Sequence, residues 1–101
     1  MREKQIQRDI IRALRSLGFQ VDDMSQPRAS MMPVGLPDLR VRHIHWKIRG
    51  WMEVKTPNGR VTPGQEQWHE TERMAGGTVA VVHSVEEALA TVAEWGAPIE
   101  V

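Results

Sequence analysis

Apolar residues recur every three or four positions near the start of the chain, at Ile6, Ile10, Leu14 and Leu17. This spacing places them on one face of a helix, so it predicts an amphipathic helix over residues 2–17. Gly18 is expected to end that helix, because glycine adopts the left-handed conformation at low cost. A short strand over residues 19–21 and a loop or irregular hairpin over residues 22–34 are expected to follow.

A period of two replaces the helical period in the middle of the chain. Apolar and basic residues alternate over residues 38–44, which predicts a strand because successive side chains of a strand point to opposite faces. A turn is expected at residues 47–50. A second strand is then predicted over residues 51–55, opened by the bulky Trp51.

A clear helix start follows these two strands. Thr62 is suited to the N-cap, Pro63 stands at the first helical position, and Gln65 lies three residues after the cap. This is the pattern of a capping box, and it predicts a helix that stops at Gly76 and Gly77.

The last part of the chain predicts one more strand and one more helix. The nearly continuous apolar run over residues 78–82 indicates a central strand covered on both faces. Ser84 and Glu87 form a second capping box, which begins a helix over residues 84–95. The expected order is helix, three strands, helix, strand, helix, so residues 1–101 are predicted to form one α/β domain with a mixed sheet between helices.

Three side chains of the two middle strands form a candidate site. Asp38 begins the first strand, and Glu53 and Lys55 share one face of the second. If the strands are neighbours, two carboxyl groups meet, and they repel unless a cation lies between them. A hard divalent ion such as Mg²⁺ prefers such oxygen ligands and can activate water toward a phosphate. Lys55 is then placed to orient that water or to neutralise charge on the phosphate.

Composition and charge restrict the class of protein. The chain has no cysteine, which rules out disulfides and thiolate metal sites. It has no apolar run long enough to span a bilayer and no signal-peptide pattern, so a soluble, intracellular protein is expected.

The net charge is zero, but the charges are unevenly distributed. Residues 39–60 hold six basic residues and one acid, whereas residues 61–101 hold seven acids and one arginine. The basic block coincides with the candidate site and could attract phosphates. Lysines and arginines that protect sheet edges from aggregation would give the same pattern, and the sequence does not separate the two interpretations.

Further polar residues have a structural and a functional interpretation. Glu3 is either a first-turn acid that favours the helix dipole or an additional carboxylate near the metal, and its spacing favours the first. Gln65 already has a role in the capping box, although the short linker after Lys55 allows it to reach the site. His43 and His45 share a strand face, but they lack the partners of a known metal motif.

These features together resemble the virus-type replication-repair nuclease (VRR-NUC) domain, a branch of the PD-(D/E)xK nuclease superfamily. The resemblance covers nearly the whole chain and depends on the order of short motifs. These are Gly35-Leu36-Pro37-Asp38-Leu39, Trp51-Met52-Glu53-Val54-Lys55, Thr62-Pro63-Gly64-Gln65 with Trp68, and Gly76-Gly77 before the apolar strand.

The resemblance implies a restriction-endonuclease-like core in which Asp38, Glu53 and the carbonyl of Val54 ligate Mg²⁺ or Mn²⁺. It implies that Lys55 is the catalytic lysine, that Gln65 supports the site and that Glu3 contributes an outer carboxylate. Stand-alone members look like phage-type proteins, and their core is similar to that of Holliday-junction resolvases. A cytoplasmic homodimer that cuts branched DNA is therefore expected.

Two other functions fit the same residues. One is a non-catalytic module that binds nucleic acid through the basic strands, although such a module has no need of two acids within its basic patch. The other is a sequence-specific, restriction-type nuclease on the same core, for which a chain of 101 residues offers little base-reading surface.

Overall fold

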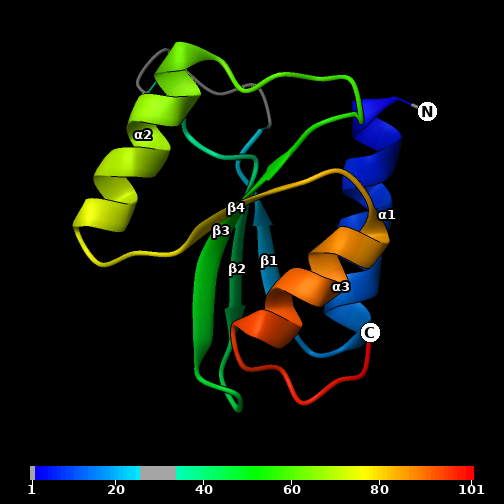
Figure 1. Ribbon diagram of the computed structural model, residues 1–101. Helices are drawn as coiled ribbons and strands as arrows, with labels where there is room; N and C mark the ends of the chain where they lie inside the picture. Colours follow the sequence, from blue (N-terminus) through cyan, green and yellow to red (C-terminus); the bar gives the residue numbers. More distant parts are fainter. Residues whose placement is uncertain (1, 26–33) are drawn as a thin grey trace.

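The computed structural model describes residues 2–25 and 34–101. Its elements follow the order helix, three strands, helix, strand, helix (Figure 1), which confirms the predicted α/β fold. They are α1 (Glu3–Ser16), β1 (Gln20–Asp23), β2 (Leu39–His43), β3 (Ile48–Val54), α2 (Pro63–Met74), β4 (Val79–Val82) and α3 (Val85–Glu94).

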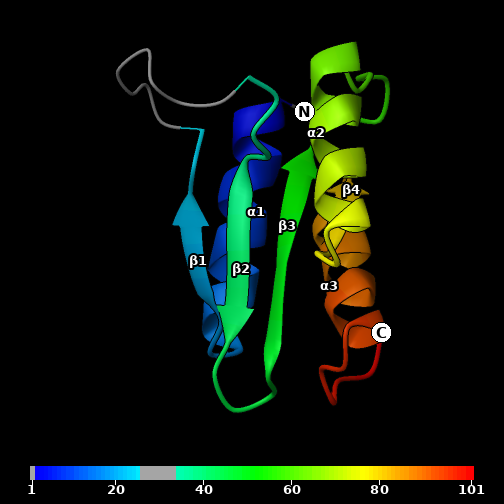
Figure 2. The ribbon, with the colours of Figure 1, turned by 90° about the vertical axis from the view of Figure 1, so that its left-hand side faces the viewer.

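The four strands form one mixed sheet in the order β1-β2-β3-β4. β1 to β3 are antiparallel, and β4 pairs with β3 in parallel. Helices α1 and α3 lie together on one face, and α2 lies on the other side beside β4 (Figures 1 and 2). Over β1 and β2, that second face carries no helix of the described chain.

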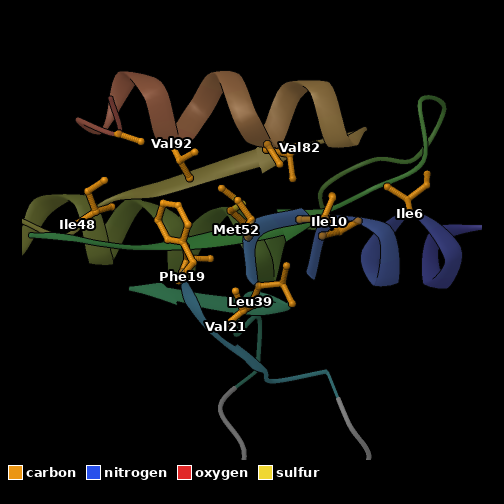
Figure 3. Close-up of a cluster of buried hydrophobic side chains, with 14 residues drawn as sticks. Ile6, Ile10, Phe19, Val21, Leu39, Ile48, Met52, Val82 and Val92 are labelled. Atoms are coloured by element: carbon orange, nitrogen blue, oxygen red, sulfur yellow. The ribbon is translucent and has the colours of Figure 1, made fainter. Parts of the chain in front are cut away.

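The main core lies between the sheet and the α1–α3 pair (Figure 3). Ile10 and Leu14 of α1 are fully buried there, as the helical spacing predicts. On β2, buried and half-buried residues alternate, so Leu39 and Val41 face the core. Arg40 and the other arginine of this strand point to the opposite face.

The second middle strand begins earlier than predicted. β3 starts at Ile48, because the turn occupies residues 44–47 and Lys47 adopts a left-handed conformation with φ of 57°. Arg49 therefore belongs to the strand and stands opposite Arg42 of β2. Asp38 lies just before β2 and not within it.

Two other local predictions are wrong in detail. β4 is an outer strand of the sheet that the described residues form, and it is apolar because α3 packs on one of its faces and α2 on the other. At the start of α3, Ser84 accepts a hydrogen bond from the Glu87 backbone, but the Glu87 carboxylate turns to the backbone N–H of His83 at 3.1 Å. The reciprocal half of the second capping box is therefore not formed.

No helix within residues 2–25 and 34–101 combines the length and the apolar character needed to cross a membrane. His43, which belongs to no known metal motif in the sequence, is buried and stacks on Trp46 with ring centroids 3.9 Å apart. Its ring nitrogens contact the Leu17 carbonyl and the Trp46 backbone N–H.

Candidate active site

The structure brings the carboxyl groups of Asp38 and Glu53 together. Antiparallel pairing of β2 with β3 places Leu39 opposite Met52. Asp38, which precedes Leu39, therefore lies beside Glu53, which follows Met52. Asp38 Oδ2 accepts a hydrogen bond of 2.8 Å from the Val54 backbone N–H, which fixes this carboxyl against the end of β3. A side-chain hydrogen bond also joins Asp38 to Glu53.

Glu53 is enclosed by α2. Only 1% of its surface is exposed, although it lies on the sheet face opposite the main core. Gln65 Nε2 donates to Glu53 Oε2 at 3.3 Å, and His69 Nε2 lies 3.3 Å from Glu53 Oε1. Both carboxyl oxygens of Glu53 are therefore held by side chains from consecutive turns of one helix.

This enclosure changes the ionisation of Glu53. Burial, the hydrogen bond with Asp38 and the charge of Asp38 raise its pKa to about 9, while the charge of Lys55 acts in the opposite direction. A carboxyl group with this pKa carries a proton at neutral pH. Two acids that share a proton form a site that a divalent cation can occupy by displacing that proton.

His69 is a site residue that sequence reasoning missed. It is 3% exposed, and burial together with the charge of Arg73 lowers its pKa. A neutral imidazole therefore contacts Glu53 at neutral pH. The available signal was its spacing, because His69 lies four residues after Gln65 and must share its helix face.

Gln65 has two roles at once. Its Oε1 accepts the Thr62 backbone N–H at 2.9 Å, and Thr62 Oγ1 accepts the Gln65 backbone N–H at 3.2 Å, which completes the predicted capping box. The same side chain reaches Glu53 with its amide nitrogen. The structural and functional interpretations of Gln65 are thus compatible.

Lys55 and Glu3 act on the site through their charges. Lys55 follows β3, is half-buried, and its backbone N–H donates to the Val82 carbonyl at 3.0 Å. Its charge opposes the rise in the pKa of Glu53, and the charge of Glu3, at the start of α1, adds to that rise. Both charges therefore act on Glu53, although the chemical roles of these side chains stay predictions.

The loop before Asp38 packs closely on the start of α2. Gly35 has φ of 84°, and a Cβ atom there would collide with the carbonyl oxygen of Gly64. Close to this contact, Trp68 of α2 meets Trp51 of β3 edge to face, with ring centroids 5.1 Å apart. The motif that contains Asp38 and the motif that contains Gln65 are therefore joined by direct packing.

The donor atoms at this point suit a hard divalent ion. In the described parts of the chain, no three side chains of the His, Asp and Glu type gather into a metal-binding cluster. The acid pair supplies carboxylate oxygens, and the Val54 peptide group lies at the same place. Mg²⁺ commonly uses one or two protein carboxylates and completes its shell with water and substrate phosphates, so the residues fit such an ion.

The chain is similar to several solved structures. One, described as a "VRR_NUC domain", is 26% identical, covers 92% of this chain and 96% of its own, and has a TM-score of 0.76. Another, a "VRR_NUC domain protein", is 14% identical, covers 94% and 88%, and has a TM-score of 0.71, which shows the fold alone. No family model matches the sequence, and no curated protein matches it significantly. The structural similarity supports a VRR-NUC domain, which confirms the family resemblance of the sequence motifs and indicates a nuclease domain.

Proposed function

We propose that this protein is a metal-dependent DNA endonuclease that hydrolyses phosphodiester bonds in branched DNA, such as four-way junctions and flaps. The observation that carries the proposal is the contact of the buried Glu53 with the half-buried Asp38. Burying Glu53 against the half-buried Asp38 costs folding free energy, which a bound ligand can offset. A divalent cation removes this cost and gives the contact a function.

The proposed ligands of this ion are the carboxylates of Asp38 and Glu53 and the carbonyl of Val54, with Mg²⁺ or Mn²⁺ as the ion. When bound, such an ion supplies Lewis-acid stabilisation of a phosphate and lowers the pKa of a water molecule. Glu53 must lose its proton for this to occur, and Gln65 and His69 then hold its two oxygens in place.

The remaining residues act on the phosphate and the water. Lys55 is half-buried and its charge acts on Glu53, which supports a role in which its ammonium group donates hydrogen bonds to the attacking water or to a phosphate oxygen as negative charge develops. In-line attack of water on phosphorus then expels the opposite sugar oxygen. Glu3 contributes a further negative charge at the edge of the site, suited to an outer water of the metal.

The test is a cleavage panel. The purified protein is incubated with four-way junctions, flaps and plain duplex in Mg²⁺, in Mn²⁺ and in EDTA. Cleavage is expected with either metal, and branched substrates should be cut faster than plain duplex. Asp38→Asn and Glu53→Gln should abolish it, whereas Glu70→Gln, which removes one exposed acid from α2, should not. Cleavage that persists in both site variants would come from a contaminant and would defeat the proposal.

A homodimer is part of the proposal, because a four-way junction presents two related strands for cleavage. Light scattering of the protein with and without a four-way junction tests this part separately. A monomer on the junction that still cuts it would leave the endonuclease assignment intact and remove the dimer.

A further inference from the structure

Three arginines gather on the open face of the sheet, away from the acid pair. Arg42 of β2 and Arg49 of β3 are directly opposite each other, and Arg40 is opposite Trp51. Like charges directly opposite each other destabilise an antiparallel pair. These strands are internal, since the sheet order is β1-β2-β3-β4, so protection of a sheet edge does not explain the arginines.

The acid nearest to these arginines does not satisfy them. A single oxygen of Asp22 on β1 accepts from Arg40 at 2.8–2.9 Å and from Arg42 at 3.3 Å. Arg42 Nε is shielded from solvent and, among the described residues, has no hydrogen-bond partner. Asp22 therefore orients two guanidinium groups but leaves donors available for another anion.

A cavity of about 390 Å³ opens over these arginines and extends to the C-terminal end of α2. Glu72 is the acid in its lining, so the three arginines exceed the two acids, Asp22 and Glu72, by one charge. The backbone N–H groups of Gly76 and Gly77 donate to carbonyls of the last turn of α2. These N–H groups are therefore not available to a bound anion, and the arginines remain as its donors. A second hollow of about 360 Å³ is also lined by Arg42 and Arg49 and includes Lys47.

We infer that this arginine cleft, formed by Arg40, Arg42 and Arg49, binds the phosphate backbone of the DNA at a distance from the bond that is cut. The inference rests on the proposed endonuclease function. Guanidinium groups in a cleft suit phosphate oxygens, and they position a duplex without reading its sequence. Arg49 lies four residues before Glu53 on the same strand, which is about 13 Å at 3.3 Å per residue. This equals about four base pairs of a duplex that runs along β3.

The first test measures the salt dependence of DNA binding in EDTA, where no cleavage occurs. The variants are Arg49→Gln and the double variant Arg42→Gln/Arg49→Gln, with Arg8→Gln/Arg12→Gln on the exposed face of α1 as the charge-matched control. For a flap labelled for fluorescence anisotropy, the slope of log K against log salt should fall by about one per lost phosphate contact.

The control should keep the slope of the wild-type protein, and Arg49→Lys should keep most of it because the charge remains. Single-turnover cleavage at saturating DNA by the Arg8→Gln/Arg12→Gln control should stay within about twofold of wild type. Thermal melting verifies that each variant is folded, and Arg49→Gln alone, at an exposed position, keeps the test decisive if the double variant unfolds. Equal slopes for Arg49→Gln and wild type would overturn the inference.

A second test shortens the duplex arms of the substrate one at a time, to fewer than four base pairs beyond the cleaved bond. Trimming one arm should weaken wild-type binding to the level of the double variant and leave the double variant unchanged. If trimming weakens both proteins equally, the cleft does not touch that backbone. If the wild-type protein neither binds nor cuts DNA, the proposed function itself is overturned. If the wild-type protein cuts DNA and the arginine variants bind DNA as it does, only the proposed role of the cleft is overturned.

Discussion

Replacing Glu53 with glutamine should make the metal-free protein more stable at alkaline pH. The amide has nearly the shape of a protonated carboxyl group and can still donate toward Asp38 and accept from Gln65. Unlike the carboxyl group, it cannot lose a proton. The variant therefore removes the ionisation and keeps most of the packing.

The size of the effect follows from the pKa of Glu53, which is about 9 in the folded chain against an ordinary value of 4.5. Between these values the folded state holds one proton more than the unfolded state. The stability that this provides is complete below pH 4.5 and is lost as the pH rises toward 9, by about 1.4 kcal/mol for each pH unit. Over two pH units the wild-type protein should lose about 3 kcal/mol relative to Glu53→Gln.

His69 requires the measurement to stay on the alkaline side. Its lowered pKa has the opposite sign, because the unfolded state binds its proton first, and this costs stability as the pH falls below the ordinary value of 6.5. Urea unfolding followed by tryptophan fluorescence, between about pH 6.5 and 8.5 in EDTA, therefore isolates Glu53. Glu70→Gln serves as the control and should follow the wild-type profile.

The reasoning is refuted if wild type and Glu53→Gln have parallel pH profiles in EDTA. Addition of Mg²⁺ provides a second comparison, since an ion that binds only the folded state stabilises it by about 2.7 kcal/mol at one hundred times its dissociation constant. This gain should appear in the wild-type protein, grow with pH as Glu53 loses its proton, and be absent from Glu53→Gln.

Three other predictions concern single side chains. Lys55→Met should lower single-turnover cleavage by about 100-fold or more while the melting temperature changes little, because the side chain is half-buried and acts on developing charge; an unchanged rate would remove Lys55 from the chemistry. His69→Ala should lower the free energy of unfolding by about 2–4 kcal/mol and weaken Mg²⁺ binding in calorimetric titration, since it empties a buried site beside Glu53; intact metal affinity would show that His69 only fills space. Gly50→Ala should cost about 1–3 kcal/mol in urea unfolding, because a Cβ atom would lie 2.7 Å from the ring of Trp95; wild-type stability would mean that this ring moves aside at little cost.

The order of elements could be predicted because its signals are local. Three patterns each predict a short segment independently of the rest of the chain. They are the alternation of residues along β2, the helical spacing in α1 and the cap formed by Thr62 and Gln65. The juxtaposition of Asp38 and Glu53 follows from the same signals, since two strands joined by a tight turn pair with each other. The prediction that Gln65 supports this site came from the resemblance to a known family.

What could not be predicted depends on contacts between distant segments. The spacing places His69 on the helix face of Gln65, but only the packing of α2 on β3 and β4 brings its ring to the Glu53 carboxyl group. The left-handed conformation of Lys47, which fixes the start of β3, has no signal in its residue type. The sequence also left open whether the basic block guards sheet edges, and this depends on the order of strands in the sheet.

β3 carries Arg49 near one end and Glu53 near the other, and it is bonded to a neighbouring strand on each side. The distance along β3 between Arg49 and Glu53 is therefore fixed. Inserting one residue between these positions would turn every side chain beyond it to the wrong face, so the spacing cannot drift by small steps. Among proteins built on this plan, a different reach along the DNA would have to come from the loops, where lengths are free to change, and not from this strand.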